Sequence, residues 1–222
     1  MHLVFDVNET LLDTGSLNPL FRRLFGSEAL RSEWFLTLQE GWMTANLIER
    51  FEPFAALAQS ALRQLGAKHG VDISPDDEQT LVEGMLTMPA HADAAAALAR
   101  LREAGHRLTA LTNSALKAAH QQLGHAGLDG YFDVILSVES VARYKPSAEP
   151  YRQVADHWGV PAGELVMIAA HGWDLIGAHA AGLRTAFIAR PGKAMDPKLG
   201  SVPDWHDDDL VRLVTRIADA AA

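Results

Sequence analysis

The sequence contains no cysteine among its 222 residues. The chain therefore cannot form disulfides, bind zinc or an iron–sulfur cluster through thiolates, or use a thiol as a nucleophile. Its ten histidines show neither HExxH spacing nor any clustered pattern. We accordingly expect neither a metal nor another cofactor.

Long apolar runs and an excess of basic residues are also missing. No run approaches the roughly 20 apolar residues that span a bilayer, and no basic stretch followed by an apolar one indicates a secretory signal. With 28 acidic and 19 basic residues the formal net charge is -9, so the surface should repel nucleic acids and anionic membranes. We expect a cytoplasmic protein that acts on a small molecule, without a nucleic-acid or membrane partner.

What the sequence does contain is an alternation of apolar runs and helical patterns. Five short runs are typical of buried strands, at 2–7, 107–113, 134–138, 165–170 and 184–190. Helical patterns that close with glycine lie at 94–105, 114–127, 147–159 and 174–182. This alternation predicts an α/β fold with a parallel sheet and helices on both faces. In such a sheet the binding crevice lies beyond the carboxyl ends of the strands.

One segment, residues 15–88, breaks the alternation. It has helical periodicity and no convincing strand, and its sequence SPDDE at 74–78 is typical of a capped helix start. Because the segment follows the first strand directly, we expect a helical cap over the crevice, where it would exclude water and shape a pocket. The predicted core then comprises residues 1–14 and 89–222.

Four of the predicted strands end in, or lead into, polar residues: Asp6 and Asn8, Thr112 and Asn113, Lys145, and Asp174. Residues two apart on a strand point the same way, so Asp6 and Asn8 can share the crevice. Taken singly, Asn113, Ser114, Ser147 or Asp174 is better explained as the N-cap of the following helix than as a site residue. Capping does not predict an acid, a hydroxyl–amide pair, a lysine and another acid at four strand ends, so the joint pattern favours a site.

These motifs resemble those of the haloacid dehalogenase superfamily, whose members have a Rossmann-like core. The matching stretches are DVNETLLD at Asp6, LTNS at 111–114, YKPSAEPY at Lys145, and AAHGWD ending at Asp174. Four motifs in order make a specific signal, whereas DxNxT alone would be weak. The resemblance covers essentially the whole chain, the helical segment included.

Two missing acids favour the dehalogenases of this superfamily over its phosphatases. Phosphatases carry a second acid where this chain has Asn8, and an amide cannot act as a general acid. Their fourth motif has an acid that helps to hold magnesium, an ion that prefers oxygen ligands, where this chain has Ala170. A halide leaves without a proton. KPxxxxY ending at Tyr151, the pair Trp173–Asp174, and PDW at 203–205 further resemble the type II 2-haloacid dehalogenases.

The resemblance implies roles for the matching residues. The counterpart of Asp6 attacks the halogen-bearing carbon and forms an ester that water then opens. Thr10 would position the nucleophile, Lys145 would keep Asp6 ionised, since a nearby cation lowers a carboxylate pKa by about 1 to 3 units, and Asp174 would orient Lys145 or the water. The implied substrate contacts are Asn8, Thr112, Asn113 and Tyr151.

The chain also departs from this family in the cap. Type II dehalogenases carry an arginine there that cradles the halide, and its counterpart in this chain is Trp34 or Phe35. The indole N–H of Trp34 could serve as the halide donor, or the side chain could simply be packed, because buried indoles usually need some partner.

Further departures lie in the first and fourth motifs. Asn8 and Glu9 stand where the family usually has an aromatic residue and a glycine, and Ala169 and His171 replace a serine and an asparagine. With an ordinary pKa near 6.5, His171 could position or deprotonate the water that opens the ester. The alternative is a loop histidine bonded to the backbone.

The sequence therefore predicts a metal-independent hydrolase that acts on a small 2-haloacid through an aspartyl ester on Asp6. A magnesium-dependent phosphatase for a small phosphomonoester is the first alternative. A catalytically silent protein that binds a small anion is the second. Members of the resembling family are often dimers, so a homodimer is implied.

Overall fold

The computed structural model describes residues 1–200 and 202–220, and its centre is a parallel sheet with the strand order β3-β2-β1-β4-β5-β6. The strands are β1 (His2–Phe5), β2 (Arg107–Thr112), β3 (Val134–Ser137), β4 (Leu165–Ala169), β5 (Arg184–Ile188) and β6 (Trp205–Asp207). The first five confirm the predicted strands, each ending one or two residues earlier. The sequence analysis missed β6.

All five pairs of neighbouring strands are parallel. In the middle, β1 pairs with both β2 and β4, so that His2 lies opposite Arg107 on one side and Leu165 on the other. Successive residues of β1 face opposite layers. Val4 packs with the layer that contains Tyr151, whereas Phe5 belongs to the core cluster on the other side.

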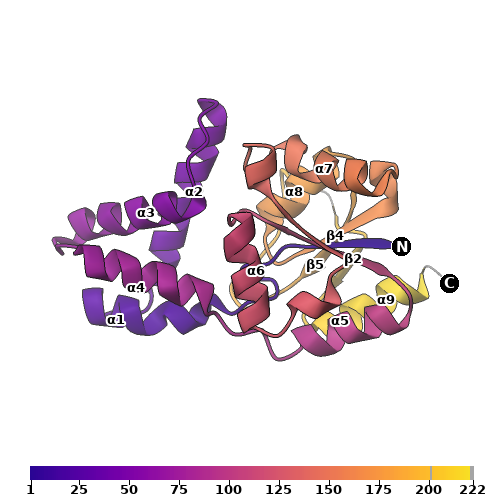
Figure 1. Cartoon of the computed structure of the whole chain (residues 1–222), viewed down its shortest axis with the longest axis horizontal. Coiled ribbons are helices and arrows are strands. Elements are labelled where there is room, and N and C mark those ends of the chain that lie inside the picture. Colours follow the sequence, from indigo (N-terminus) through magenta and orange to yellow (C-terminus); the bar gives the residue numbers. More distant parts are fainter. Residues whose placement is uncertain (201, 221–222) are drawn as a thin grey trace.

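Helices cover both faces of the sheet, as predicted. Figure 1 shows α7 (Ala148–Trp158) and α8 (Gly172–Ala180) above the strands, and α5 (Ala94–Glu103) and α9 (Leu210–Asp219) below them. α6 (Leu116–His125) lies at the end of the sheet nearest the helical segment. The strands are therefore enclosed by apolar side chains on both faces, which explains their continuous apolar sequences.

Between β1 and α5 the described chain forms helices without a regular strand. A short 3-10 helix, η1 (Thr14–Leu17), leads into α1 (Asn18–Phe25), α2 (Leu30–Leu47), α3 (Phe54–His69) and α4 (Pro75–Leu86). Figure 1 shows these helices gathered to one side of the sheet. The N-terminus of α4 has the predicted capping box, in which Ser74 and Asp77 each accept from the other's backbone N–H. We propose that residues 15–88 act as a cap.

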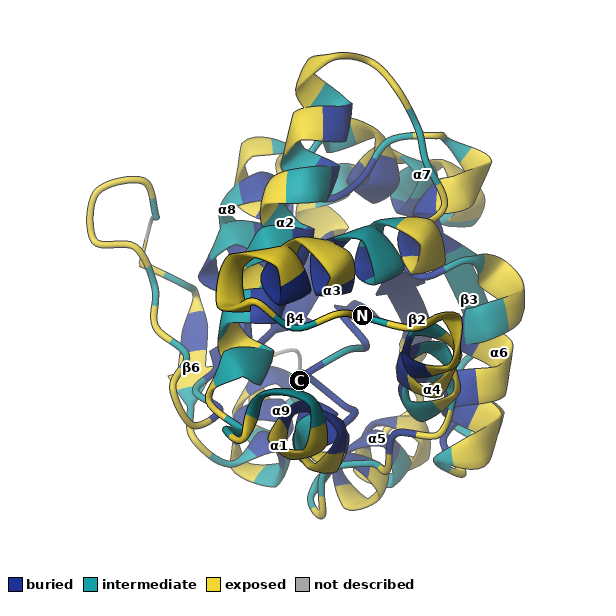
Figure 2. Ribbon diagram, turned by 90° about the vertical axis from the view of Figure 1, so that its left-hand side faces the viewer, coloured by how far each residue is buried: buried dark blue, intermediate teal, exposed yellow. Residues whose placement is uncertain are grey.

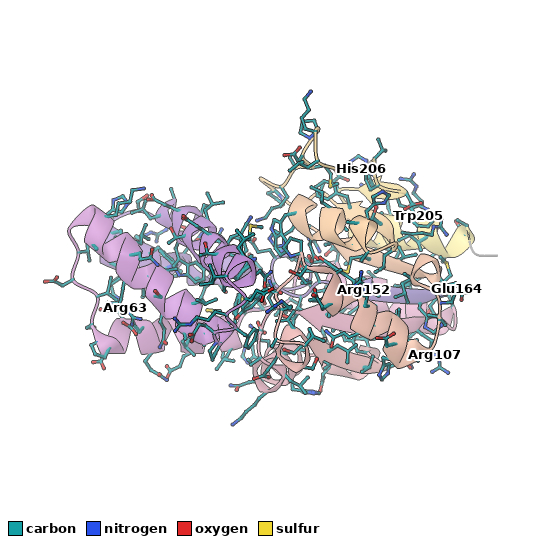
Figure 3. All side chains as sticks on the ribbon, turned by 90° about the horizontal axis from the view of Figure 1, so that it is seen from above. Arg63, Arg107, Arg152, Glu164, Trp205 and His206 are labelled. Atoms are coloured by element: carbon teal, nitrogen blue, oxygen red, sulfur yellow. The ribbon has the colours of Figure 1, made fainter. Side chains whose placement is uncertain are left out.

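The carboxyl ends of the strands face this helical segment. In Figure 3, Arg107 and Glu164, which stand at the amino ends of β2 and β4, lie on the side away from it, and Arg63 of α3 marks the far end of the helices. In Figure 2, viewed from the helical side, the outer surface of α3 is exposed and the strands behind it are buried. The junction between helices and sheet is therefore where a crevice must be sought. None of the described helices combines the length and the apolar composition needed to cross a membrane.

Candidate active site

Asp6 directly follows β1 and is almost fully buried, with 5% of its surface exposed. Its backbone N–H donates to the carbonyl of Ile168, which extends the pairing of β1 with β4 and fixes the main chain. Thr10 Oγ1 donates to Asp6 Oδ2 over 2.6 Å and itself accepts from the backbone N–H of Ala170 over 2.9 Å. Because a hydroxyl has a single hydrogen, this acceptor role leaves the Thr10 hydrogen for Asp6.

Lys145 connects the two buried acids of the site and is itself fully buried. Its Nζ donates to Asp6 Oδ1 over 2.8 Å, to Asp174 Oδ2 over 2.6 Å and to the carbonyl of Leu111 over 3.1 Å. These acceptors use all three hydrogens of an ammonium group. Burial alone would lower the pKa of Lys145, but the carboxylates of Asp174 and Asp6 raise it, so the ammonium form persists.

The same contacts keep Asp6 ionised. Burial by itself raises the pKa of a carboxyl group, but the charge of Lys145 and the hydrogen bond with His171 outweigh it, and the pKa of Asp6 lies below its ordinary range. An ionised, nearly dehydrated carboxylate is a competent nucleophile. The Lys145 ammonium lies between the carboxylates of Asp6 and Asp174, in the position that a metal ion shared by these two carboxylates would occupy. Among the described residues, no group of three potential ligands is arranged to hold a metal ion.

Asp174 supports Lys145 and does not cap its helix. It lies in the first turn of α8, whose N-cap residue is His171, and it is fully buried. The hydroxyl of Tyr151, on α7, donates to Asp174 Oδ1 over 2.6 Å. Tyr151, which was expected to contact the substrate, does not belong to the lining of the cavity over Asp6. It reaches the site only through Asp174.

The remaining candidate caps do not bind a helix N-terminus either. The N-cap residue of α6 is Ala115, and Ser147 occupies the N-cap position of α7 without a side-chain hydrogen bond. Asn113 Oδ1 accepts from the backbone N–H of Lys145 over 3.1 Å, which leaves its amide nitrogen as the donor. Ser114 Oγ accepts from Asn8 Nδ2 over 3.3 Å.

His171 is buried between two carboxylates. Its Nδ1 lies 3.3 Å from Asp6 Oδ2 and its Nε2 lies 2.6 Å from Glu9 Oε2, while the ring of Phe35 stacks on its face at 5.5 Å between centroids. His171 is thus bonded to side chains, whereas the alternative stated above was a loop histidine bonded to the backbone. Burial alone would lower the pKa of His171, but the hydrogen bonds to Asp6 and Glu9 raise it, which favours the imidazolium form in the free enzyme.

Glu9 is the acid that the sequence analysis noted as a departure but did not place in the site. It is buried, and its backbone has a φ of 63°, in the left-handed region that favours glycine. Besides His171 it contacts the ammonium of Lys193, the hydroxyl of Thr14 and, at 3.4 Å, the guanidinium of Arg31. Burial raises the pKa of Glu9, but the bond with His171 and the charge of Lys193 outweigh it, and the pKa lies below the ordinary range.

A cavity of about 20 Å³ lies over Asp6. Its lining comes from the ends of β1 and β2, from α2 and α3, and from the start of α8: Asp6, Asn8, Phe35, Trp42, Phe54, Thr112, Asn113, His171 and Trp173. This volume holds roughly one water-sized species. One end of the lining is polar and the other is aromatic. Among the described residues that form this lining, Asp6 is the one acid.

The tryptophan expected to bind a halide is not part of this cavity. Trp34 Nε1 donates to the carbonyl of Ala58 on α3 over 3.0 Å, and the side chain is 2% exposed. The indole N–H of Trp34, which was expected to bind a halide, is thus bonded to the main chain of α3. Phe35 does line the cavity. Trp42, Phe54 and Trp173 complete the aromatic end, and the sequence analysis had given none of them a role in the site.

Comparisons with known proteins agree over nearly the whole chain. Residues 1–182 match the family model for haloacid dehalogenase-like hydrolases. The (S)-2-haloacid dehalogenase of Pseudomonas sp. (strain YL) is 27% identical over 222 residues, 99% of this chain and 95% of that one. Haloacetate dehalogenase H-2 of Moraxella sp. (strain B) is 27% identical over 181 residues, 82% of this chain and 80% of that one. A crystal structure of an L-2-haloacid dehalogenase matches with a TM-score of 0.92 and 28% identity, covering 97% of each chain.

Proposed function

Because the chain belongs to the haloacid dehalogenase-like hydrolases, we propose that it is a metal-independent 2-haloacid dehalogenase with Asp6 as its nucleophile. The observation that carries this proposal is the state of Asp6: an ionised carboxylate, bound by Lys145 and Thr10, in a cavity where Asn8 replaces a second acid. Among the described residues that line the cavity, Asp6 is thus the one acid, and no second carboxyl group of this lining can protonate a leaving group. A halide is a leaving group that needs no proton.

In the first step an oxygen of Asp6 attacks the carbon that bears the halogen. A C–O bond forms, the C–halogen bond breaks, and the halide leaves with the bonding electrons, so the product is an ester of Asp6. The hydrogen bonds from Lys145 and Thr10 hold the carboxylate in place, and the burial of Asp6 limits the access of bulk water to it.

In the second step water attacks the carboxyl carbon of Asp6, and we propose His171 as the base. Formation of the ester removes the charge of Asp6, so His171 loses one of its two anionic partners, its pKa falls, and it can become neutral. Its Nδ1, 3.3 Å from Asp6 Oδ2, lies within reach of a water beside the ester carbonyl. Lys145 stabilises the negative charge that develops on the carboxyl oxygen. The bond between the carboxyl carbon and the alkoxide oxygen then breaks, and His171 passes the proton of the water to that oxygen, so the 2-hydroxyacid leaves. The oxygen of the water stays on Asp6, whose new carboxyl group gives its proton to His171 and so restores the carboxylate and the imidazolium.

Asp174 and Tyr151 act on this chemistry through Lys145. Asp174 accepts one hydrogen of the Lys145 ammonium, and the hydroxyl of Tyr151 donates to Asp174 in turn. These two hydrogen bonds hold the Lys145 side chain in the position from which it contacts Asp6. These two residues are positioning residues, since neither lines the cavity.

The cavity supports a short substrate. The free volume of about 20 Å³ is smaller than any haloacid, so side chains of the lining must move to admit a substrate, and we propose the smallest 2-haloacids, haloacetates and 2-halopropionates, as substrates. Phe35, His171 and Trp173 also line a neighbouring pocket of about 290 Å³ that includes the loop around Lys193. These three side chains form the partition between the two spaces, and substrate would enter across them.

Halide release from chloroacetate and 2-chloropropionate tests the proposal, measured with and without a chelator. We expect release that the chelator does not change and that Asp6→Asn abolishes. Turnover in water labelled with oxygen-18 should place the label in Asp6, which mass spectrometry can detect. A folded protein that releases no halide from a broad panel of haloacids would refute the proposal. Chelator-sensitive hydrolysis of p-nitrophenyl phosphate would instead identify a phosphatase.

A further inference from the structure

Two indole N–H groups beside Asp6 are buried and lack an acceptor. Trp42 Nε1 and Trp173 Nε1 have no hydrogen-bond partner among the residues that the structure describes. The two rings lie 5.5 Å apart between centroids, and both line the cavity that contains Asp6. Buried polar groups in proteins are almost always bonded, so an unpaired pair at one cavity needs an explanation.

Two other indoles, that of buried Trp34 and that of half-buried Trp158, show that this fold can satisfy a tryptophan where no ligand is needed. Trp34, on the same helix as Trp42, donates to the carbonyl of Ala58. Trp158 donates to Thr109 Oγ1 over 2.9 Å. Among the described residues, the indole nitrogens that are both buried and unpaired are those of Trp42 and Trp173, at the cavity where a ligand can supply the acceptor.

We propose that the N–H groups of Trp42 and Trp173 bind the halide as it leaves, an inference that rests on the proposed dehalogenation. A 2-haloacid presents two anionic groups during the reaction, its carboxylate and the departing halide. The polar end of the cavity, with Asn8, Thr112 and Asn113, offers the several donors that a carboxylate needs. The aromatic end then receives the halide.

The chemistry of an indole suits this role. Its N–H only donates, so it offers a halide no competing lone pair, and the edge of an aromatic ring carries partial positive charge. A neutral donor fixed by packing also costs no reorganisation when charge develops on the halogen. Phe35, where an arginine was expected, contributes apolar wall and no donor. The two tryptophans therefore replace a charged group with two neutral ones.

Anion binding to the free enzyme tests the proposal directly, with titrations of bromide and acetate followed by calorimetry. Trp42→Phe and Trp173→Phe keep a ring and remove only the N–H and part of the indole. Each should weaken bromide binding by about tenfold or more, the effect of one hydrogen bond to a charged group, and should leave acetate binding within about twofold. Trp158→Phe is the matched control, since it removes a paired indole N–H outside the cavity.

Turnover supplies a second readout. Fluoride is a poorer leaving group than bromide and depends more on hydrogen bonding, so each variant should lose more activity on fluoroacetate than on bromoacetate. Unchanged bromide affinity in both variants would overturn the proposal, and so would loss of acetate affinity in place of bromide affinity. Trp42 is the more deeply buried of the two, so Trp173→Phe keeps the test valid if Trp42→Phe does not fold.

The experiments distinguish failure of the proposed dehalogenase activity from failure of the proposed halide site. A wild-type protein that releases halide, with variants that bind bromide as it does, would remove the indole site and leave the dehalogenase standing. A wild-type protein that releases no halide would remove the dehalogenase, and the bromide titration would still decide whether the indoles bind an anion.

Discussion

Replacing Glu9 with glutamine should lower the pKa of His171 and move the acid limb of the pH–rate profile to lower pH. In the free enzyme His171 lies between Asp6, at 3.3 Å, and Glu9, at 2.6 Å. Once Asp6 is esterified, Glu9 is the remaining anion in contact with the ring. Removing a carboxylate at such a distance lowers a histidine pKa by about 1 to 3 units, and kcat should follow if opening of the ester limits turnover.

The same substitution should destabilise the protein more at low pH than at high pH. The folded state raises the pKa of His171, so its contribution to stability is complete below its ordinary pKa of about 6.5 and is lost as the pH rises through the folded value. The pKa of Glu9 is lowered, so Glu9 stays ionised across this range. We expect Glu9→Gln to cost on the order of 1 to 4 kcal/mol near pH 5.5 and clearly less near pH 8.5, measured by urea unfolding.

Glu9→Gly is the companion variant, because the backbone at this position is left-handed with a φ of 63°. Glycine adopts this conformation freely, whereas another residue loses about 1 kcal/mol or more. Glu9→Gly should therefore shift the pH–rate profile as Glu9→Gln does, with a smaller loss of stability. An acid limb that stays in place in both variants would refute the assignment of His171 as the base.

Further substitutions test the supporting residues. Asp174→Asn leaves the buried ammonium of Lys145 short of one carboxylate and should lower the free energy of unfolding by about 3 to 5 kcal/mol, with kcat falling by more than about tenfold. Tyr151→Phe removes one hydrogen bond to Asp174 and should lower kcat by about three- to tenfold, with KM nearly unchanged because Tyr151 does not line the cavity. Phe35→Ala should remove part of the partition to the neighbouring pocket, so that the ratio of kcat/KM for 2-chlorobutyrate to that for chloroacetate rises; an unchanged ratio would argue against Phe35 as a limit on substrate size.

The fold could be predicted because the strands of a parallel sheet are buried on both faces and so appear as continuous apolar runs. The runs at 2–7 and 165–170 are nearly without polar residues, and their length of six residues is typical of strands. β6 could not be found in this way. It has three residues, of which Trp205 alone is buried, and a polar tripeptide at the edge of a sheet gives no periodic signal.

The charged centre of the site could also be predicted, since topology brings the carboxyl ends of parallel strands together. Asp6, Lys145 and Asp174 follow three strands of one sheet and meet within hydrogen-bond distance. Lys193 could not be placed, because it lies in an irregular loop after β5 whose path depends on tertiary packing. Glu9 carried a signal that was not used: an acid where glycine was expected indicates a strained position retained for its side chain.

The choice of tryptophan could not be made from the sequence at all. Trp34 and Trp42 are eight residues apart on α2, about two helical turns, so both fall on its buried face. Periodicity predicts this burial and says nothing about which N–H finds an acceptor. That depends on the carbonyl of Ala58 on α3, which lies against Trp34 and not against Trp42. Long-range packing thus decides which indole is structural and which faces the cavity.

The charges around the cavity explain how neutral donors can serve for the halide. Before the reaction Lys145 and His171 are both bound to the charge of Asp6. Ester formation moves that charge from Asp6 to the halide inside the same cavity, so both cations lose a partner as a new anion appears near them. Trp42 and Trp173 then need only to fix its position. Bromide should accordingly bind more tightly to Asp6→Asn than to the wild-type protein, and equal or weaker binding in calorimetry would show that the charge of Asp6 does not control the halide site.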